Sequence, residues 1–251
     1  MQNAPDNFLT IHHVSKHFFQ NETKIPVLND VSLCLKRGEI VCILGKSGCG
    51  KTTLLNITCG LEKPSSGTVN VHGTIAYIPQ KDLLLPWRTM MENILLPLEI
   101  KGSVQKQDVD KVRTYLKEFG MEKFSNAYPN QVSGGMRQKV SLIRAFLQDL
   151  DIIFFDEPLS AIDFDSRLLL EKKIRSHIAR SGKAAIFVTH NIEEAISIAD
   201  RIIILSQRPA EIITQLKVHF TKKDRDPVNL RKTTQFQHFF ERIWKTMRNQ
   251  L

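Results

Sequence analysis

A glycine-rich segment at residues 45–53 combines the residue types that bind phosphate. It fits the pattern G-x-x-x-x-G-K-[ST] and directly follows the apolar run at 40–44. Glycines let backbone N–H groups approach phosphate oxygens, and a helix that begins near Lys51 adds partial positive charge at its N-terminus. We expect Lys51 to neutralise the β- and γ-phosphates of a nucleotide and the Thr52 hydroxyl to bind Mg²⁺. The alternative is a chance match in which Lys51 is a solvated helix residue.

Two adjacent carboxylates, Asp156 and Glu157, follow a second apolar run at 152–155. Open parallel sheets place their chemistry at the C-terminal ends of the strands. At such an edge one carboxylate can bind Mg²⁺ through water, and the other can polarise an attacking water. A solvated acidic pair is the alternative, which the apolar run that leads into the pair disfavours.

Two further polar side chains follow predicted strands. Gln80 ends the segment 74–79, where its amide can cap a loop or reach a metal ion and an attacking water. His190 ends the apolar run 184–189. A lone histidine is usually structural or solvated, but this one is predicted at the same sheet end as the carboxylates and the glycine-rich segment.

An aromatic pair, Phe18 and Phe19, lies between the predicted strands 8–14 and 27–35. The face of an aromatic ring can stack on adenine. Because aromatic residues near strand ends are more often buried in the core, the residues alone favour a core position.

The remaining elements indicate an α/β fold. The strand at 8–14 alternates like an edge strand, and helical periodicity at 91–98 and 108–119 predicts a mainly helical insertion in the α/β core. Later segments are predicted as helices at 165–180, 192–199 and 235–248, strands at 201–206 and 210–216, and a charged linker at 222–227.

Composition limits the class of protein. A chain of 251 residues with 42% hydrophobic content fits one large domain or one domain with a small insertion. The net charge of +9 would suit an anionic partner, but the scattered basic residues favour a solvated surface.

Four cysteines without a C-x-x-C pair predict reduced, mostly buried thiols. Without a leader-like segment at 1–6 or a run of about eighteen apolar residues, we expect a soluble cytosolic chain that a partner holds at any membrane.

The order of these motifs resembles the nucleotide-binding subunit of ATP-binding cassette (ABC) transporters over nearly the whole chain. The matching segments are 45–53 (Walker A), Gln80 (Q-loop), 132–136 (signature), 152–157 (Walker B), 160–163 (D-loop) and His190 (switch histidine). The resemblance implies a P-loop NTPase core with an N-terminal antiparallel β subdomain and a helical signature subdomain at about 90–147. It also implies an ATPase domain at 1–220 and a basic C-terminal extension with a terminal helix at 221–251.

The resemblance implies ATP and Mg²⁺ as cofactors and assigns the site residues. In the family two cassettes face each other head to tail, so each ATP lies between the Walker A loop of one and the Ser-Gly-Gly turn of the other. Phe18 matches the adenine-stacking aromatic, which reverses the preference for a core position. The residues expected to bind ATP are Phe18, Gly45, Lys46, Ser47, Gly48, Cys49, Gly50, Lys51, Thr52, Thr53, Ser133, Gly134, Gly135 and Asp163. Glu157, His190, Gln80 and Lys51 are expected to be catalytic, and Thr52, Gln80 and Asp156 to bind the metal.

Three segments resemble importers of nitrate, sulfonate and taurine more narrowly. They are the Ser-Gly-Gly-Met-Arg-Gln version of the signature, residues 84–89 with Glu92-Asn93, and residues 189–195. Val132 and Met136 depart from the usual Leu and Gln of the signature. The resemblance implies an ATPase that powers uptake of a small anion or organic solute. Its partners would be permease subunits and, indirectly, an extracytoplasmic solute-binding protein, with no nucleic acid, at the cytoplasmic face of the cell membrane.

Other interpretations stay open. A soluble ABC ATPase that acts on nucleic acid or ribosomes would use the net charge of +9, but such relatives resemble two cassettes in one chain or a cassette split by a long coiled coil. A regulatory module with a dead site is disfavoured by the intact motif residues. The apolar segment 83–87 is either a permease-docking surface or a loop anchor. The basic residues Arg231, Lys232, Arg242, Lys245 and Arg248 contact anionic lipid or, as we favour, only solvate the terminal region.

Overall fold

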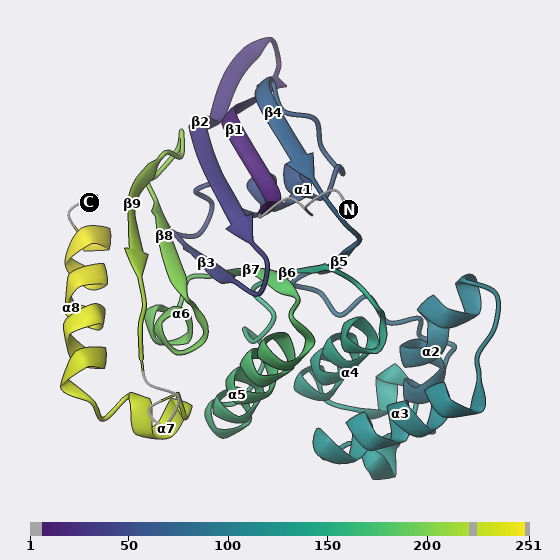
Figure 1. The fold of residues 1–251 in the computed structure, drawn as a ribbon. Helices are drawn as coiled ribbons and strands as arrows, with labels where there is room; N and C mark the ends of the chain where they lie inside the picture. Colours follow the sequence, from purple (N-terminus) through teal and green to yellow (C-terminus); the bar gives the residue numbers. More distant parts are fainter. Residues whose placement is uncertain (1–6, 221–224, 249–251) are drawn as a thin grey trace, which may run out of the picture.

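The computed structural model describes residues 7–220 and 225–248 (Figure 1). A six-stranded sheet in the order β5-β6-β7-β3-β8-β9 forms its centre. Its strands are β3 (Ile40–Leu44), β5 (Ile75–Ile78), β6 (Ile152–Asp156), β7 (Ala184–Thr189), β8 (Arg201–Leu205) and β9 (Ile212–Lys217). All neighbours pair in parallel except β9, which is antiparallel to β8. The parallel strands confirm the α/β fold predicted from the sequence.

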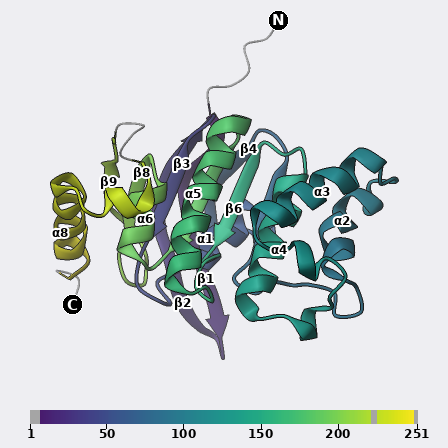
Figure 2. The ribbon, with the colours of Figure 1, turned by 90° about the horizontal axis from the view of Figure 1, so that it is seen from below.

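The central sheet separates two hydrophobic cores. Val41 and Ile43 of β3 face one core, and Cys42 and Leu44 face the other. Helix α1 (Lys51–Thr58) fills the first core between this sheet and a three-stranded sheet. Helices α4 (Gly134–Leu147), α5 (Phe164–Ser181) and α6 (Ile192–Ile198) cover the other face (Figures 1 and 2). Strands buried on both faces read as continuous apolar runs, which explains why these segments were recognisable in the sequence.

The three-stranded antiparallel sheet has the order β2-β1-β4. Its strands are β1 (Asn7–Gln20), β2 (Thr23–Lys36) and β4 (Ser66–Val71). The edge-strand prediction for 8–14 is therefore wrong: β1 lies in the middle, because β4 pairs along its second side from Leu9–Val71 to Ser15–Ser66. Alternation along a strand reports which face is buried and carries no information about a second neighbour.

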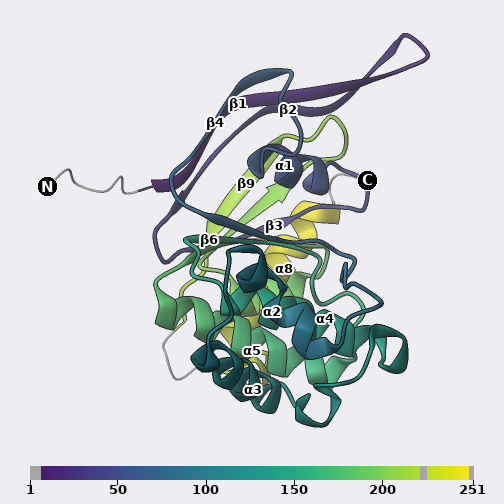
Figure 3. The same cartoon turned by 90° about the vertical axis from the view of Figure 1, so that its right-hand side faces the viewer.

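Helices α2 (Met90–Ile100), α3 (Lys106–Glu118) and α4 form a helical region beside β5 (Figures 1 and 3). A capping box starts α2, in which the Thr89 hydroxyl accepts from Glu92 N at 3.3 Å and the Glu92 carboxylate accepts from Thr89 N at 2.7 Å. Short 3₁₀ turns at 122–124 and 129–131 connect α3 to α4. These helices fall within residues 90–147, and the grouping of that segment as an inserted subdomain stays a prediction.

The apolar loop at 83–87 is held by the fully buried side chain of Asn93. Its amide oxygen accepts from Leu85 N at 2.8 Å, and its Nδ2 donates to Leu85 O and Arg88 O. Leu84 is buried beneath the loop, whereas Leu83 and Trp87 are 62% and 70% exposed. The loop therefore has an internal anchor and also presents an apolar surface to solvent.

The C-terminal region lies against the α/β core. Helix α7 (Pro227–Leu230) is capped by the Asp226 side chain, and α8 (Thr234–Arg248) buries Phe236 and Ile243 against the core that contains α6. Residues 222–224 of the predicted charged linker lie outside the described residues. Arg231, expected to be solvated, is mostly buried and pairs with Glu171 at 2.9 Å and Glu193 at 3.1 Å. Lys232, Arg242, Lys245 and Arg248 are exposed.

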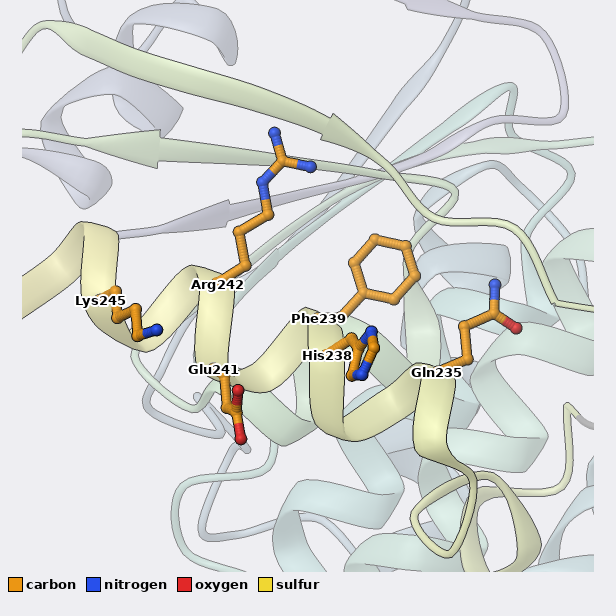
Figure 4. A pocket seen from close by; sticks show the side chains of 6 residues that line it. All are labelled: Gln235, His238, Phe239, Glu241, Arg242 and Lys245. Atoms are coloured by element: carbon orange, nitrogen blue, oxygen red, sulfur yellow. The ribbon is translucent and has the colours of Figure 1, made fainter.

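A shallow groove of about 610 Å³ runs along α8 (Figure 4). It is lined by Gln235, His238, Phe239, Glu241, Arg242 and Lys245. It carries both signs of charge, and all of its residues lie on α8, so none belongs to the glycine-rich loop. Within residues 7–220 and 225–248 no helix is long and apolar enough to cross a bilayer.

Candidate active site

The glycine-rich loop connects β3 to α1 and is held by close packing. A Cβ on Gly50, where φ is +126°, would lie 3.0 Å from Leu28 and 3.1 Å from Val27 of β2. A Cβ on Gly45 would lie 2.7 Å from Cys49 Sγ, so these two positions have no room for a side chain. This packing restricts the conformation of the loop backbone. The first backbone amides of α1, which have no partner within the helix, remain available to a ligand held by the loop.

Lys51 is buried at the centre of this loop. Its Nζ donates to Gly45 O at 2.9 Å and to Lys46 O at 3.1 Å, and lies 3.8 Å from Glu157 Oε1. The two carbonyls hold the ammonium group in the loop, where it can meet phosphate oxygens.

Asp156 ends β6 as a buried carboxylate, 4% exposed. Burial raises the pKa of Asp156, and hydrogen bonds from Thr52 and from Tyr77, at 3.2 Å, oppose that rise. The Thr52 hydroxyl and the Asp156 carboxylate thus adjoin as a pair of oxygen donors. Magnesium in nucleotide sites is held by one or two protein oxygens together with phosphates and water, so this donor set fits Mg²⁺.

Glu157 gathers three of the predicted catalytic groups around its carboxylate. Its Oε2 lies 3.1 Å from His190 Nδ1 and 3.4 Å from Gln80 Nε2, while its Oε1 faces Lys51. The backbone of Glu157 is left-handed, with φ +49°, a conformation that costs roughly 1 kcal/mol in a non-glycine residue. The structure therefore brings all four predicted catalytic residues together at the C-terminal edge of the central sheet.

His190 is positioned by its neighbours in the chain. The Asn191 side chain caps α6 by accepting from Glu193 N and Glu194 N, and the Thr189 hydroxyl donates to Glu194 Oε2 at 2.7 Å. These bonds fix the turn between β7 and α6, so the half-exposed imidazole stays beside Glu157.

A cavity of about 210 Å³, which we call the phosphate cavity, lies between the glycine-rich loop and the Glu157 carboxylate. It is lined by Ser47, Gly48, Gly50, Lys51, Thr52, Thr53, Gln80, Glu157 and Arg208. All but Arg208 were predicted from the sequence. Arg208 lies in the turn between β8 and β9, and no local pattern marks it, because only the pairing of β8 with β3 brings this turn to the loop.

The other predicted nucleotide-binding residues do not line this cavity. Phe18 lies near the C-terminal end of β1 and is 40% exposed. Lys16 Nζ lies 4.7 Å from the centroid of its ring. Phe18 is therefore not a core residue, and its ring is available for stacking. Asp163 caps α5 by accepting from Ser166 N, and hydrogen bonding by Ser166 lowers the pKa of Asp163. Ser133 caps α4 by accepting from Met136 N at 3.3 Å.

Gly134 and Gly135 are not required by the fold of this chain. Both have helical backbones. Apart from the chain neighbours and the backbone of the same helix, the nearest described atom to an added Cβ would lie 3.7 Å away at Gly134 and 3.5 Å away at Gly135, which is ordinary contact. Their lack of side chains leaves the N-terminus of α4 open to a group outside the chain.

Cys42 and Cys49 are buried and Cys34 and Cys59 half-buried, all as free thiols.

Comparison with known proteins identifies relatives of this chain. The family model described as ABC transporter matches residues 28–160. An uncharacterized ABC transporter ATP-binding protein of Bacillus subtilis is 34% identical over 249 residues, covering 96% of each chain. The formylaminopyrimidine import ATP-binding protein of Halalkalibacterium halodurans is 37% identical over 84% of each chain. The nitrate import ATP-binding protein of a Synechocystis species is 32% identical over 88% of this chain and 86% of its own.

A solved structure has the same fold. It is the dimeric, post-hydrolysis state of an ATP-binding cassette bound to ADP and Pi. It matches with a TM-score of 0.77 and 30% identity over 84% of this chain and 99% of that one.

Proposed function

Because the chain belongs to the ABC transporter family, we propose that it hydrolyses ATP to power uptake of a small anion or organic solute through membrane permease subunits. The observation that best supports this function is that the Glu157 carboxylate lies close to Lys51, His190 and Gln80 beside the phosphate cavity. Such an arrangement can hold a triphosphate and activate water in one place.

The protein residues have distinct roles in hydrolysis. Lys51 and the loop amides bind the β- and γ-phosphates, and Glu157 orients and activates the attacking water. His190 contacts the γ-phosphate. Thr52, Asp156 and Gln80 would hold Mg²⁺, which would neutralise charge on the phosphates when bound. Catalysis then rests on positioning and charge stabilisation.

Two copies of the chain complete the site. The open N-terminus of α4, with Ser133, Gly134 and Gly135, does not line the phosphate cavity of its own chain. In a head-to-tail pair it faces the ATP held by the other copy, and its amides contact the γ-phosphate. ATP binding closes the pair, and hydrolysis reopens it.

The chain acts at the cytoplasmic face of the membrane through the permease. Exposed Leu83 and Trp87 supply an apolar surface that a permease helix can cover. Selection of the solute belongs to the permease and an extracytoplasmic solute-binding protein. We group residues 1–220 as the ATPase domain and 221–251 as a C-terminal extension, of which helices α7 and α8 pack on the core.

Copurification tests the assignment. The tagged chain is recovered from gently solubilised membranes, and its companions are identified by mass spectrometry. A polytopic permease is expected, and the solute-binding protein that accompanies this permease is then screened for ligands. Recovery with ribosomal proteins or nucleic acid, and without a membrane protein, would contradict the importer function and favour a soluble ABC ATPase.

A further inference from the structure

We propose that Arg208 binds the phosphate groups of the nucleotide, as a second cation beside Lys51. The inference rests on the proposed function, because it adds a residue to the same site. Arg208 lines the phosphate cavity together with Ser47, Gly48 and Lys51, although it lies more than 150 residues further along the chain.

Backbone hydrogen bonds fix the turn that carries Arg208. Ser206 N donates to Glu211 O at 2.9 Å and closes the turn. Ala210 N donates to Val27 O at 2.8 Å and Asn29 N donates to Ala210 O at 2.9 Å, which ties the turn to β2. The position of Arg208 is therefore set by the backbone on both sides of it.

Strand β2 and the end of strand β8, which hold this turn, also contact the glycine-rich loop. A Cβ on Gly50 would lie against Val27 of β2, and a Cβ on Gly45 would lie 3.4 Å from Leu205 Cβ at the end of β8. The turn with Arg208 and the glycine-rich loop thus both contact β2 and the end of β8. Their relative positions stay constant as long as these strands are folded.

The charge of Arg208 is available for a ligand. Within the described part of the chain it forms no ion pair, whereas Glu157, the carboxylate in the cavity, faces Lys51 and His190. Burial raises the pKa of Cys49 in the loop, and the positive charges of Lys51 and Arg208 oppose that rise. The field of Arg208 therefore reaches the loop.

Phosphate is the ligand chemistry that suits this group. A guanidinium presents five N–H donors in a planar fork that matches two phosphate oxygens, and such charge-assisted bonds are stronger than neutral ones. A nucleotide in the cavity brings several phosphate oxygens next to a cation that has no carboxylate partner among the described residues.

Equilibrium binding of ATP and ADP to the purified chain, at concentrations below dimerisation, tests the proposal. R208A should raise the Kd for ATP about tenfold, as expected for one lost charge-assisted contact. It should also make log Kd less steeply dependent on salt, and R208K should restore part of the affinity. R113A, which removes an exposed arginine of α3, is the matched control and should bind as the wild type does.

The outcomes separate this proposal from the function on which it rests. If R208A binds ATP and ADP with the Kd and salt dependence of the wild type, Arg208 is a solvated surface residue and the proposal is wrong. If the wild-type chain itself fails to bind ATP, the proposed function is at fault. An unchanged thermal unfolding midpoint of R208A confirms that lost binding is not lost folding.

Discussion

Glu157 and His190 follow adjacent parallel strands, β6 and β7, and Glu157 Oε2 lies 3.1 Å from His190 Nδ1. The backbone joins them too, because Glu157 N donates to Val188 O at 2.9 Å. Parallel strands in register bring their C-terminal residues to one edge, so the two residues proposed as catalytic meet without a special connecting segment. Substitution of Glu157 therefore tests the proposed activation of water directly.

We expect E157Q to keep ATP binding and lose turnover. Glutamine is isosteric and keeps a polar contact to His190, but it cannot accept a proton from water. The rate of phosphate release should fall by roughly 10²–10⁴-fold, and size-exclusion chromatography with ATP should show an accumulated closed dimer. E118Q, an exposed change on α3, is the control. A wild-type rate of phosphate release in E157Q would show that Glu157 does not activate the attacking water.

G135A separates folding from assembly. Alanine at a helical position with ordinary contacts should leave the unfolding free energy unchanged or raise it by up to about 1 kcal/mol. ATP affinity of the monomer should stay constant, because Gly135 does not line its own phosphate cavity. The added methyl should instead weaken ATP-dependent dimerisation, measured by sedimentation. Normal dimerisation would show that the N-terminus of α4 faces no nucleotide across an interface.

Local patterns were sufficient for most elements. The apolar runs at β3 and β7 match the observed strands from end to end, because both are buried on two faces. The glycine-rich loop and the Asp156–Glu157 pair were recognisable because each directly follows such a strand. These signals are all contained within about ten residues of chain.

Other features depend on contacts between distant segments. The central place of β1 requires β4, and the burial of Arg231 requires Glu171 of α5. Arg208 reaches the cavity only through the pairing of β8 with β3 and of its turn with β2. Periodicity reports faces of an element and not its partners, so none of these could be predicted from the sequence alone.

W87A tests the docking surface. Trp87 is 70% exposed, so its removal should change the unfolding free energy by less than about 0.5 kcal/mol. An aromatic anchor buried in a partner usually contributes about 2 kcal/mol or more. The yield of copurified permease should therefore fall sharply while ATP binding persists. I100A, at a 77% exposed apolar position on α2, is the control, and an unchanged yield with W87A would assign the loop a purely internal role.

The last prediction concerns pH and His177 on α5. Its ring stacks on Phe146 at 3.9 Å, and burial, aided by the positive charges of Lys183 and Arg180, lowers its pKa from 6.5 to about 4. Between these values the unfolded chain binds a proton that the folded chain excludes, so the unfolding free energy should decrease as pH falls from 6.5 to about 4. This site contributes at most about 3 kcal/mol to the decrease.

H177F should remove that part of the pH dependence. Its ring can keep the stack on Phe146, and it eliminates the buried Nε2, which has no hydrogen-bond partner among the described residues. Urea unfolding at pH 7.5 and pH 5 is therefore expected to give a smaller difference for H177F than for the wild type. H238F, which replaces an exposed histidine of α8, should retain the wild-type difference. Equal losses in H177F and the wild type would mean that folding does not lower the pKa of His177, because only a group whose pKa differs between the folded and unfolded chain makes stability depend on pH.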